Sequence, residues 1–209
     1  SKVNARDIWI SSTNHGAGGT INIDGAGQRK DHKSQVNAIT ITIGDEGDGT
    51  VNVKNDGMIS ANRLIIGEKA TGNLNVSSGG NVAVNNIERD TAGKANLVLN
   101  GADIKVEQGN QDDFFKGFTT NDKIELKSEG IEFNVNQYNV TINPNARLTG
   151  DVGKFTLRPS PINYSGSFMK VGGGTLTMST QSKQFDGDFN VIQGKLELLG
   201  DYTMKAGET

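Results

Sequence analysis

The feature that most constrains this chain is a 23-residue repeat between Ile39 and Val106. Its clearest signature is a pair of apolar residues separated by one polar residue, which occurs three times: Val51 and Val53, Leu74 and Val76, Leu97 and Leu99. A period of this length is typical of solenoid proteins, in which each repeat buries its apolar side only by stacking on its neighbours. The repeat therefore takes precedence over any reading of single segments.

Each repeat alternates apolar and polar residues, as in residues 50–54, and this alternation predicts strands with one side facing water. Three short strands separated by Gly, Asn and Asp fit one coil of a parallel β-helix. At about 20 to 23 residues per coil, the chain makes roughly nine coils. We therefore expect an all-β solenoid that forms a single domain over residues 1–209, with Val51 stacked on Leu74 and Leu74 on Leu97.

Composition narrows the possible partners. Hydrophobic residues make up 33% of the chain, which is enough for a narrow core, and 28 glycines suit a chain that turns often. The net charge is −3 with both signs mixed, which argues against a nucleic-acid partner. No run of 18 apolar residues is present, so no membrane span is expected within this fragment. The absence of cysteine excludes a disulfide scaffold and a thiolate metal site.

Residues 24–35 interrupt the repeat and are expected to project as a loop insertion. The segment contains a basic run with Arg29, Lys30, His32 and Lys33, which are candidate partner-binding residues because loops on a rigid scaffold often carry function. The alternative is a solvated insertion without a partner.

Residues 107–163 are less regular and contain Phe114 and Phe115 next to Phe118. Phe114 and Phe115 are a second candidate for partner binding, although such a cluster is more often core at the corner of a coil. Trp9 is expected to be a core or end-capping residue. Arg89 falls at a position where the repeat calls for an inward apolar side chain, so we expect residues 88–90 to bulge outward.

Residues 164–204 return to a regular repeat, in which Phe168 recurs as Phe189 and Leu176 as Leu196. The segments Gly172 to Met178, Phe185 to Val191 and Gly194 to Leu198 resemble the strand repeats of bacterial autotransporter (type V secretion) passenger domains. The likeness covers about residues 114–200. It departs from the family pattern at Met178 and Ser179, where Leu and a small turn residue are usual.

This resemblance implies a right-handed, single-stranded parallel β-helix. It also implies export across the inner membrane and through an outer-membrane barrel that lies elsewhere in the full protein, so that the passenger is displayed on the cell surface or secreted. The partner would be a host cell-surface protein or glycan, or a second copy of the chain through self-association. Because the chain begins at Ser1, we expect it to be an excised or processed fragment.

No catalytic, cofactor-binding or metal-binding constellation is expected. The only histidines are His15 and His32, and neither a nucleophile elbow nor a zinc spacing is present. The acidic turn at residues 44–49 lacks the ligand spacing of an EF-hand and is read as a tight turn. Polysaccharide-active β-helix enzymes place carboxylates on neighbouring coils, but the equivalent positions compared here, Asp56 with Gly79 and Asp48 with Thr71, do not stack acids.

The sequence therefore favours a non-enzymatic virulence factor that binds host cells as an adhesin. The alternative is a released passenger that engages a host receptor and triggers signalling. A polysaccharide-active enzyme ranks third.

Overall fold

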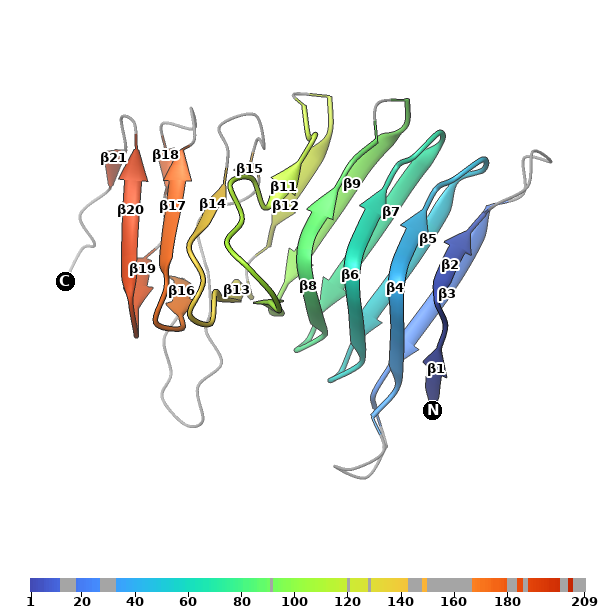
Figure 1. Cartoon of the computed structure of the whole chain (residues 1–209), viewed down its shortest axis with the longest axis horizontal. Coiled ribbons are helices and arrows are strands. Elements are labelled where there is room, and N and C mark those ends of the chain that lie inside the picture. Colours follow the sequence, from blue (N-terminus) through green and yellow to red (C-terminus); the bar gives the residue numbers. More distant parts are fainter. Residues whose placement is uncertain are drawn as a thin grey trace.

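The computed structural model describes residues 1–11, 18–26, 33–90, 92–119, 121–127, 129–142, 148–149, 167–179, 184–185, 188–199 and 203–204. Strands account for all the regular secondary structure in these residues, and the strand pairs among them are parallel. The chain is therefore an all-β protein built from parallel sheets, with successive strands side by side from the N-terminus at the right of Figure 1 to the C-terminus at the left.

The largest sheet has ten strands in the order β1-β4-β6-β8-β10-β13-β16-β19, with β2 also pairing with β4 and β11 with β8. Its strands are β1 (Lys2–Asn4), β2 (Asp7–Ile10), β4 (Gln35–Ile43), β6 (Met58–Ile66), β8 (Asn81–Glu88), β10 (Ala102–Val106), β11 (Phe115–Lys116), β13 (Ile131–Asn134), β16 (Ser167–Val171) and β19 (Asp188–Val191).

A second sheet has six strands in the order β15-β12-β9-β7-β5-β3. Its strands are β3 (Gly19–Asp24), β5 (Gly49–Lys54), β7 (Thr71–Ser77), β9 (Lys94–Asn100), β12 (Lys123–Leu126) and β15 (Leu148–Thr149). A three-stranded sheet contains β14 (Val140–Ile142), β17 (Thr175–Ser179) and β20 (Lys195–Leu199), and a two-stranded sheet contains β18 (Gln184–Phe185) and β21 (Thr203–Met204).

The predicted apolar stack is confirmed. Val51 is the register partner of Leu74, and Leu74 that of Leu97, so residues 23 positions apart lie beside each other in neighbouring strands. All three side chains are buried, and the column continues to Ile124 in β12. Burying one such aliphatic side chain contributes about 1.5–3 kcal/mol, so these columns supply the core that a single repeat lacks.

The second set of repeats is also confirmed where the structure describes it. Phe168 pairs with Phe189 in the largest sheet, and Leu176 pairs with Leu196 in the three-stranded sheet. Ile104 lies 22 residues after Val82, one fewer than the repeat length, and still pairs with it. The periodicity of the sequence thus locates the register in both halves of the chain.

Polar residues on the outer surface of the second sheet form a ladder of side-chain amides. Asn75 Nδ2 donates to Asn52 Oδ1 over 2.8 Å, and Asn52 Nδ2 donates to Asn22 Oδ1 over 2.8 Å. Each amide therefore uses its neighbours on adjacent strands as partners, which is a structural role.

The sequence predicted that Trp9 is a core or end-capping residue, but the structure shows that it does not lie in the core. Its side chain is 56% exposed, whereas its neighbour Ile10 is buried and pairs with Ile43. Strand alternation explains the difference, because inward-facing Ile10 forces Trp9 to the opposite face of β2. Among the described residues, no helix is long and apolar enough to cross a membrane.

Candidate functional site

The basic loop proposed as a partner-binding site is described only at its end. Arg29, Lys30 and His32 lie outside the described residues, so their placement stays a prediction. Lys33 is described and exposed, and its Nζ lies 3.6 Å from Asp56 Oδ1. Between two exposed side chains, such a pair leaves the lysine accessible to a partner.

Placing Phe114 and Phe115 on a binding surface was wrong. Phe114 has no exposed surface and Phe115 is 3% exposed. Their rings meet edge-to-face with centroids 5.0 Å apart, and Phe114 contacts Phe133 in the same way. The cluster fills the core where the regular repeats end, because three large rings bury more apolar area there than the small repeat residues can supply.

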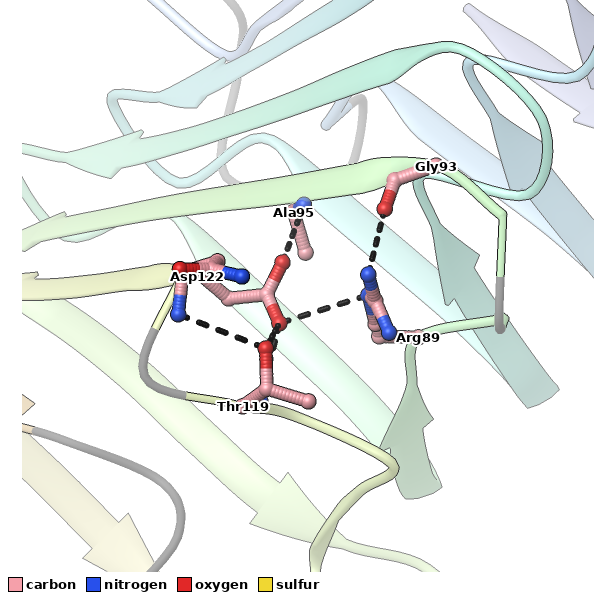
Figure 2. Close-up of polar contacts among 6 residues, drawn as sticks. Arg89, Gly93, Ala95, Thr119 and Asp122 are labelled. Atoms are coloured by element: carbon pink, nitrogen blue, oxygen red, sulfur yellow. Dashed lines mark hydrogen bonds and ion pairs between the residues drawn. The ribbon is translucent and has the colours of Figure 1, made fainter.

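Arg89 does not bulge outward, which corrects a second expectation. Figure 2 shows its side chain beside Asp122, and the two charges are both sheltered: Arg89 Nε lies 3.3 Å from Asp122 Oδ2, with side-chain exposures of 15% and 1%. Arg89 also donates to the Gly93 carbonyl oxygen over 2.7 Å. The inward position of the repeat is therefore kept, and the missing apolar residue is replaced by an ion pair.

The carboxylate of Asp122 is fully engaged by its neighbours. Oδ1 accepts the Ala95 N–H over 2.8 Å, and Oδ2 accepts both the N–H and the hydroxyl of Thr119 over 2.8 and 2.9 Å. With a side chain only 1% exposed, Asp122 is closed off from a substrate. The Arg89–Asp122 ion pair connects the irregular segment before β12 to the regular strands β8 and β9, and its role is structural.

Two acids do stack on neighbouring strands, contrary to the comparison of repeat positions made from the sequence. Asp103 in β10 is the register partner of Glu132 in β13. Burial, and then the charge of Asp103, raise the pKa of Glu132 above its usual range. The sequence comparison missed this pair because β10 and β13 are 29 residues apart in register, outside the 23-residue period.

The acidic turn at residues 44–49 has protein partners. Lys69 Nζ lies 3.2 Å from Asp45 Oδ1 and 3.5 Å from Glu46 Oε1. Asp48 Oδ1 accepts the Thr71 N–H over 2.9 Å. In the described part of the chain, no group of three or more His, Cys, Asp or Glu side chains is placed to hold a metal ion.

A shallow, open hollow lies in the C-terminal half of the chain, where the turns after β13, β16 and β19 stack. This corner pocket has a volume of about 500 Å³. It is lined by Asn134, Asn136, Gln137, Tyr138, Val171, Gly172, Gly173 and Gln193. Because β16 lies between β13 and β19 in the sheet, the glycine turn lies between two turns that carry larger side chains.

The glycines of the middle turn create the hollow. Gly172 has a φ of +87°, and a Cβ there would lie 2.4 Å from the main chain of Asn136, so this position requires glycine. Gly173 is different, because a Cβ at that position would meet only Gln193 Nε2 at 3.9 Å. The space above Gly173 is therefore open and is bounded by the side chain of Gln193.

The corner pocket is polar but carries no charged side chain. Asn134 Oδ1 accepts the Asn136 N–H over 2.8 Å, and Asn136 Nδ2 donates to the Val106 carbonyl over 2.6 Å. The other amide atoms of these two residues, and the side chains of Gln137 and Gln193, have no hydrogen-bond partner among the described residues. Several donors and acceptors are thus available at one place.

A buried lysine lies beneath the pocket. Lys170 has no exposed surface, and its Nζ donates to the carbonyl oxygens of Gly172, Gln193 (2.8 Å) and Val171 (3.3 Å). Burial lowers the pKa of Lys170. The three carbonyls use all three N–H donors of the ammonium, so Lys170 joins two adjacent turns and offers no donor to a ligand.

Sequence reasoning missed the corner pocket. Its lining comes from three turns whose alignment depends on the pairing of Asn134 with Val171 and of Lys170 with Val191. The available signal was the run Gly172 to Gly174 between turns rich in Asn and Gln.

No protein-family model, curated protein or solved structure matches the chain.

Proposed function

We propose that this chain is part of a right-handed, single-stranded parallel β-helix of roughly nine coils, and that it belongs to a bacterial passenger domain exported through the outer membrane. It acts as a non-enzymatic adhesin that is displayed or secreted and binds host cells. The observation that carries the proposal is the parallel, in-register pairing of strands one repeat apart, together with the resemblance of residues 114–200 to passenger strand repeats.

The architecture supports a display role by its geometry. Strands one repeat apart extend the molecule in one direction, so the outer surface grows with each repeat (Figure 1). Such a scaffold holds turns at fixed spacing, which suits multivalent contact with a surface more than a single enclosed reaction.

The test is binding of the purified chain to cultured epithelial cells. Beads coated with the chain should bind the cells, and replacing Arg29, Lys30 and Lys33 with alanine should weaken binding if the basic loop takes part. The matched control replaces three other exposed lysines, Lys105, Lys123 and Lys127. Loss of binding in both triple variants would indicate a general charge effect, and absence of binding by the wild-type chain would refute the adhesin.

The same cells separate the adhesin from a signalling effector. An adhesin acts when it is held on a bead or cell, whereas an effector changes host-cell signalling when the soluble chain is added. Phosphorylation measured after addition of the soluble chain would therefore favour the effector.

A second candidate, a polysaccharide-cleaving enzyme, is favoured by the stacking of Asp103 and Glu132. A carboxyl with a raised pKa beside a second carboxylate is the pair from which glycosidases build a general acid. Release of reducing sugar from polysaccharides by the wild-type chain, and its loss in Glu132→Gln, would establish this function in place of the adhesin.

A further inference from the structure

We infer that the corner pocket binds an uncharged saccharide ring, so that the glycan of the host surface is contacted at the turns after β13, β16 and β19. This inference rests on the proposed function, since it specifies the chemistry by which the adhesin would engage its target. It is argued from the size, the lining and the rigidity of the pocket.

The size of the pocket suits one or two sugar units. A volume of about 500 Å³ lies within the usual range for small-molecule sites. The hollow lies over Gly173, where the middle turn has no side chain, while the turns on either side carry Asn136, Gln137 and Gln193. A ligand can therefore approach the main chain of the middle turn and be held from both sides.

The lining matches sugar hydroxyl groups. A hydroxyl both donates and accepts a hydrogen bond, and a carboxamide supplies a donor and an acceptor side by side. Asn134, Asn136, Gln137 and Gln193 bring four carboxamides to the pocket, with unused donors and acceptors. Because no charged side chain lines the pocket and the Lys170 donors are occupied, the lining selects a neutral ligand.

Tyr138 supplies the apolar contact that a sugar ring needs. Tyr138 is partly buried against the core and is one of the residues that line the pocket. The C–H face of a pyranose packs well against an aromatic ring, while the phenol oxygen remains available for a hydroxyl. The combination of an aromatic wall and convergent amides separates this pocket from the Asn ladder, where the amides bond one another.

Two sets of partly buried hydrogen bonds hold the turns of the pocket in place before a ligand binds. Lys170 fixes the main chain of Gly172 and Gln193 through its ammonium, and Asn136 is anchored to the Val106 carbonyl. The φ of +51° at Asn136 is one that asparagine tolerates better than most residues. A site fixed in this way loses little conformational entropy on binding.

The experiment uses saturation-transfer difference NMR on the full chain with four probes. These are the methyl glycosides of galactose, mannose, N-acetylglucosamine and N-acetylneuraminic acid. At least one neutral glycoside should bind, and Gly173→Phe, whose ring would fill the open space, should weaken that binding by roughly tenfold or more. Gln193→Ala should weaken it as well, through the lost amide, which provides a second variant if Gly173→Phe fails to fold.

Matched controls locate the effect. Gly173→Ala adds one methyl group near Gln193 and should leave most of the binding, and Asn75→Ala removes an amide from the ladder far along the chain and should leave it unchanged. The inference is overturned if no glycoside binds, if Gly173→Phe and Gln193→Ala both bind as the wild type does, or if the anionic N-acetylneuraminide binds more tightly than every neutral probe.

Cell binding by the same variants separates this inference from the proposed function. If the wild-type chain binds cells but none of the four glycosides, the inference that the corner pocket binds a saccharide is wrong, and the adhesin proposal is unaffected. Glycoside binding without cell binding would refute the adhesin and support the pocket.

Discussion

Among the described residues, Arg89 and Lys170 are cations sheltered from solvent, and each is stabilised differently. Arg89 faces a carboxylate, so the pair is neutral as a unit, whereas Lys170 is held by main-chain carbonyl dipoles alone among the described residues. Replacing one partner of a buried ion pair leaves the other charge uncompensated, which is usually more costly than removing both.

Asp122→Asn should lower the free energy of unfolding by about 3 kcal/mol, the range for breaking one side of a buried pair. The side chain keeps its shape but no longer neutralises Arg89. Chemical denaturation followed by circular dichroism measures the change. Asp56→Asn is the matched control, because Asp56 pairs with Lys33 at the surface and its loss should leave stability nearly unchanged.

The double variant Asp122→Asn with Arg89→Met tests the same explanation. It should recover part of the lost stability, because no unpaired charge remains inside. Equal stability of Asp122→Asn and Asp56→Asn would show that the Arg89 pair contributes nothing.

Glu132→Gln should raise the stability at pH 7. Burial and the Asp103 charge raise the pKa of Glu132 in the folded chain, so the ionised form disfavours folding above that pKa. As the pH falls through the raised pKa, the native carboxyl takes up a proton and the penalty disappears. The advantage of Glu132→Gln should therefore shrink toward pH 4. Thermal melts of both chains between pH 4 and 8 measure it, and an advantage independent of pH would contradict the explanation.

At the scale of strands and turns, the glycine after β6 is one of the positions of the regular repeats that require glycine. Gly67 has a φ of +74°, and a Cβ there would lie 2.4 Å from the Lys94 carbonyl oxygen. The turn after β6 and the start of β9 lie so close together here that no side chain fits between them.

Gly67→Ala should destabilise the chain by roughly 2 kcal/mol or more, from the left-handed backbone and the main-chain contact together. Gly173→Ala serves as the control, because its Cβ meets nothing closer than 3.9 Å and it should melt close to the wild type. Equal thermal midpoints for the two variants would mean that the turn after β6 can accommodate a side chain.

The sequence predicts the regular strands well because their pattern depends on one local rule. The stacking of Val51 on Leu74 follows from alternation and a constant period. Trp9 and Arg89 were misplaced because residue type was allowed to outweigh alternation: an aromatic residue was assumed buried, and a charged one exposed.

The corner pocket could not be predicted because it depends on which turns become neighbours. Asn134 pairs with Val171 across 37 residues of sequence, so the period that aligns the earlier rows does not apply there. The pairings of β13 with β16 and of β16 with β19 bring the amides and Tyr138 beside the glycine turn.

At the scale of the whole molecule, the constant register predicts that one repeat can be removed. Deleting residues 58–80 takes out 23 residues and joins Gly57 to Asn81. Because Gln35, Met58 and Asn81 are successive register partners, β8 should then pair with β4 as β6 does now. The shortened chain should fold cooperatively, with a thermal midpoint lowered by roughly 5 °C.

The control deletes residues 58–81, one residue more. It should fold poorly, because a shift by one residue turns inward side chains outward along β8. Far-ultraviolet circular dichroism and thermal melts compare the two. If the two deletion variants have the same thermal midpoint, the stacking of apolar residues in neighbouring strands does not determine the fold.

The direction of the strand pairing also determines how the protein responds to force. Hydrogen bonds between neighbouring parallel strands run across the strands, along the line on which β4, β6, β8 and β10 succeed one another (Figure 1). Tension applied between the two ends of the molecule would therefore load the successive strand pairs in series. The outermost strand would detach first, and the remaining strands would stay paired. A molecule loaded in this way extends in steps as its strands detach one by one. Strands loaded in shear would instead resist the force and then rupture together.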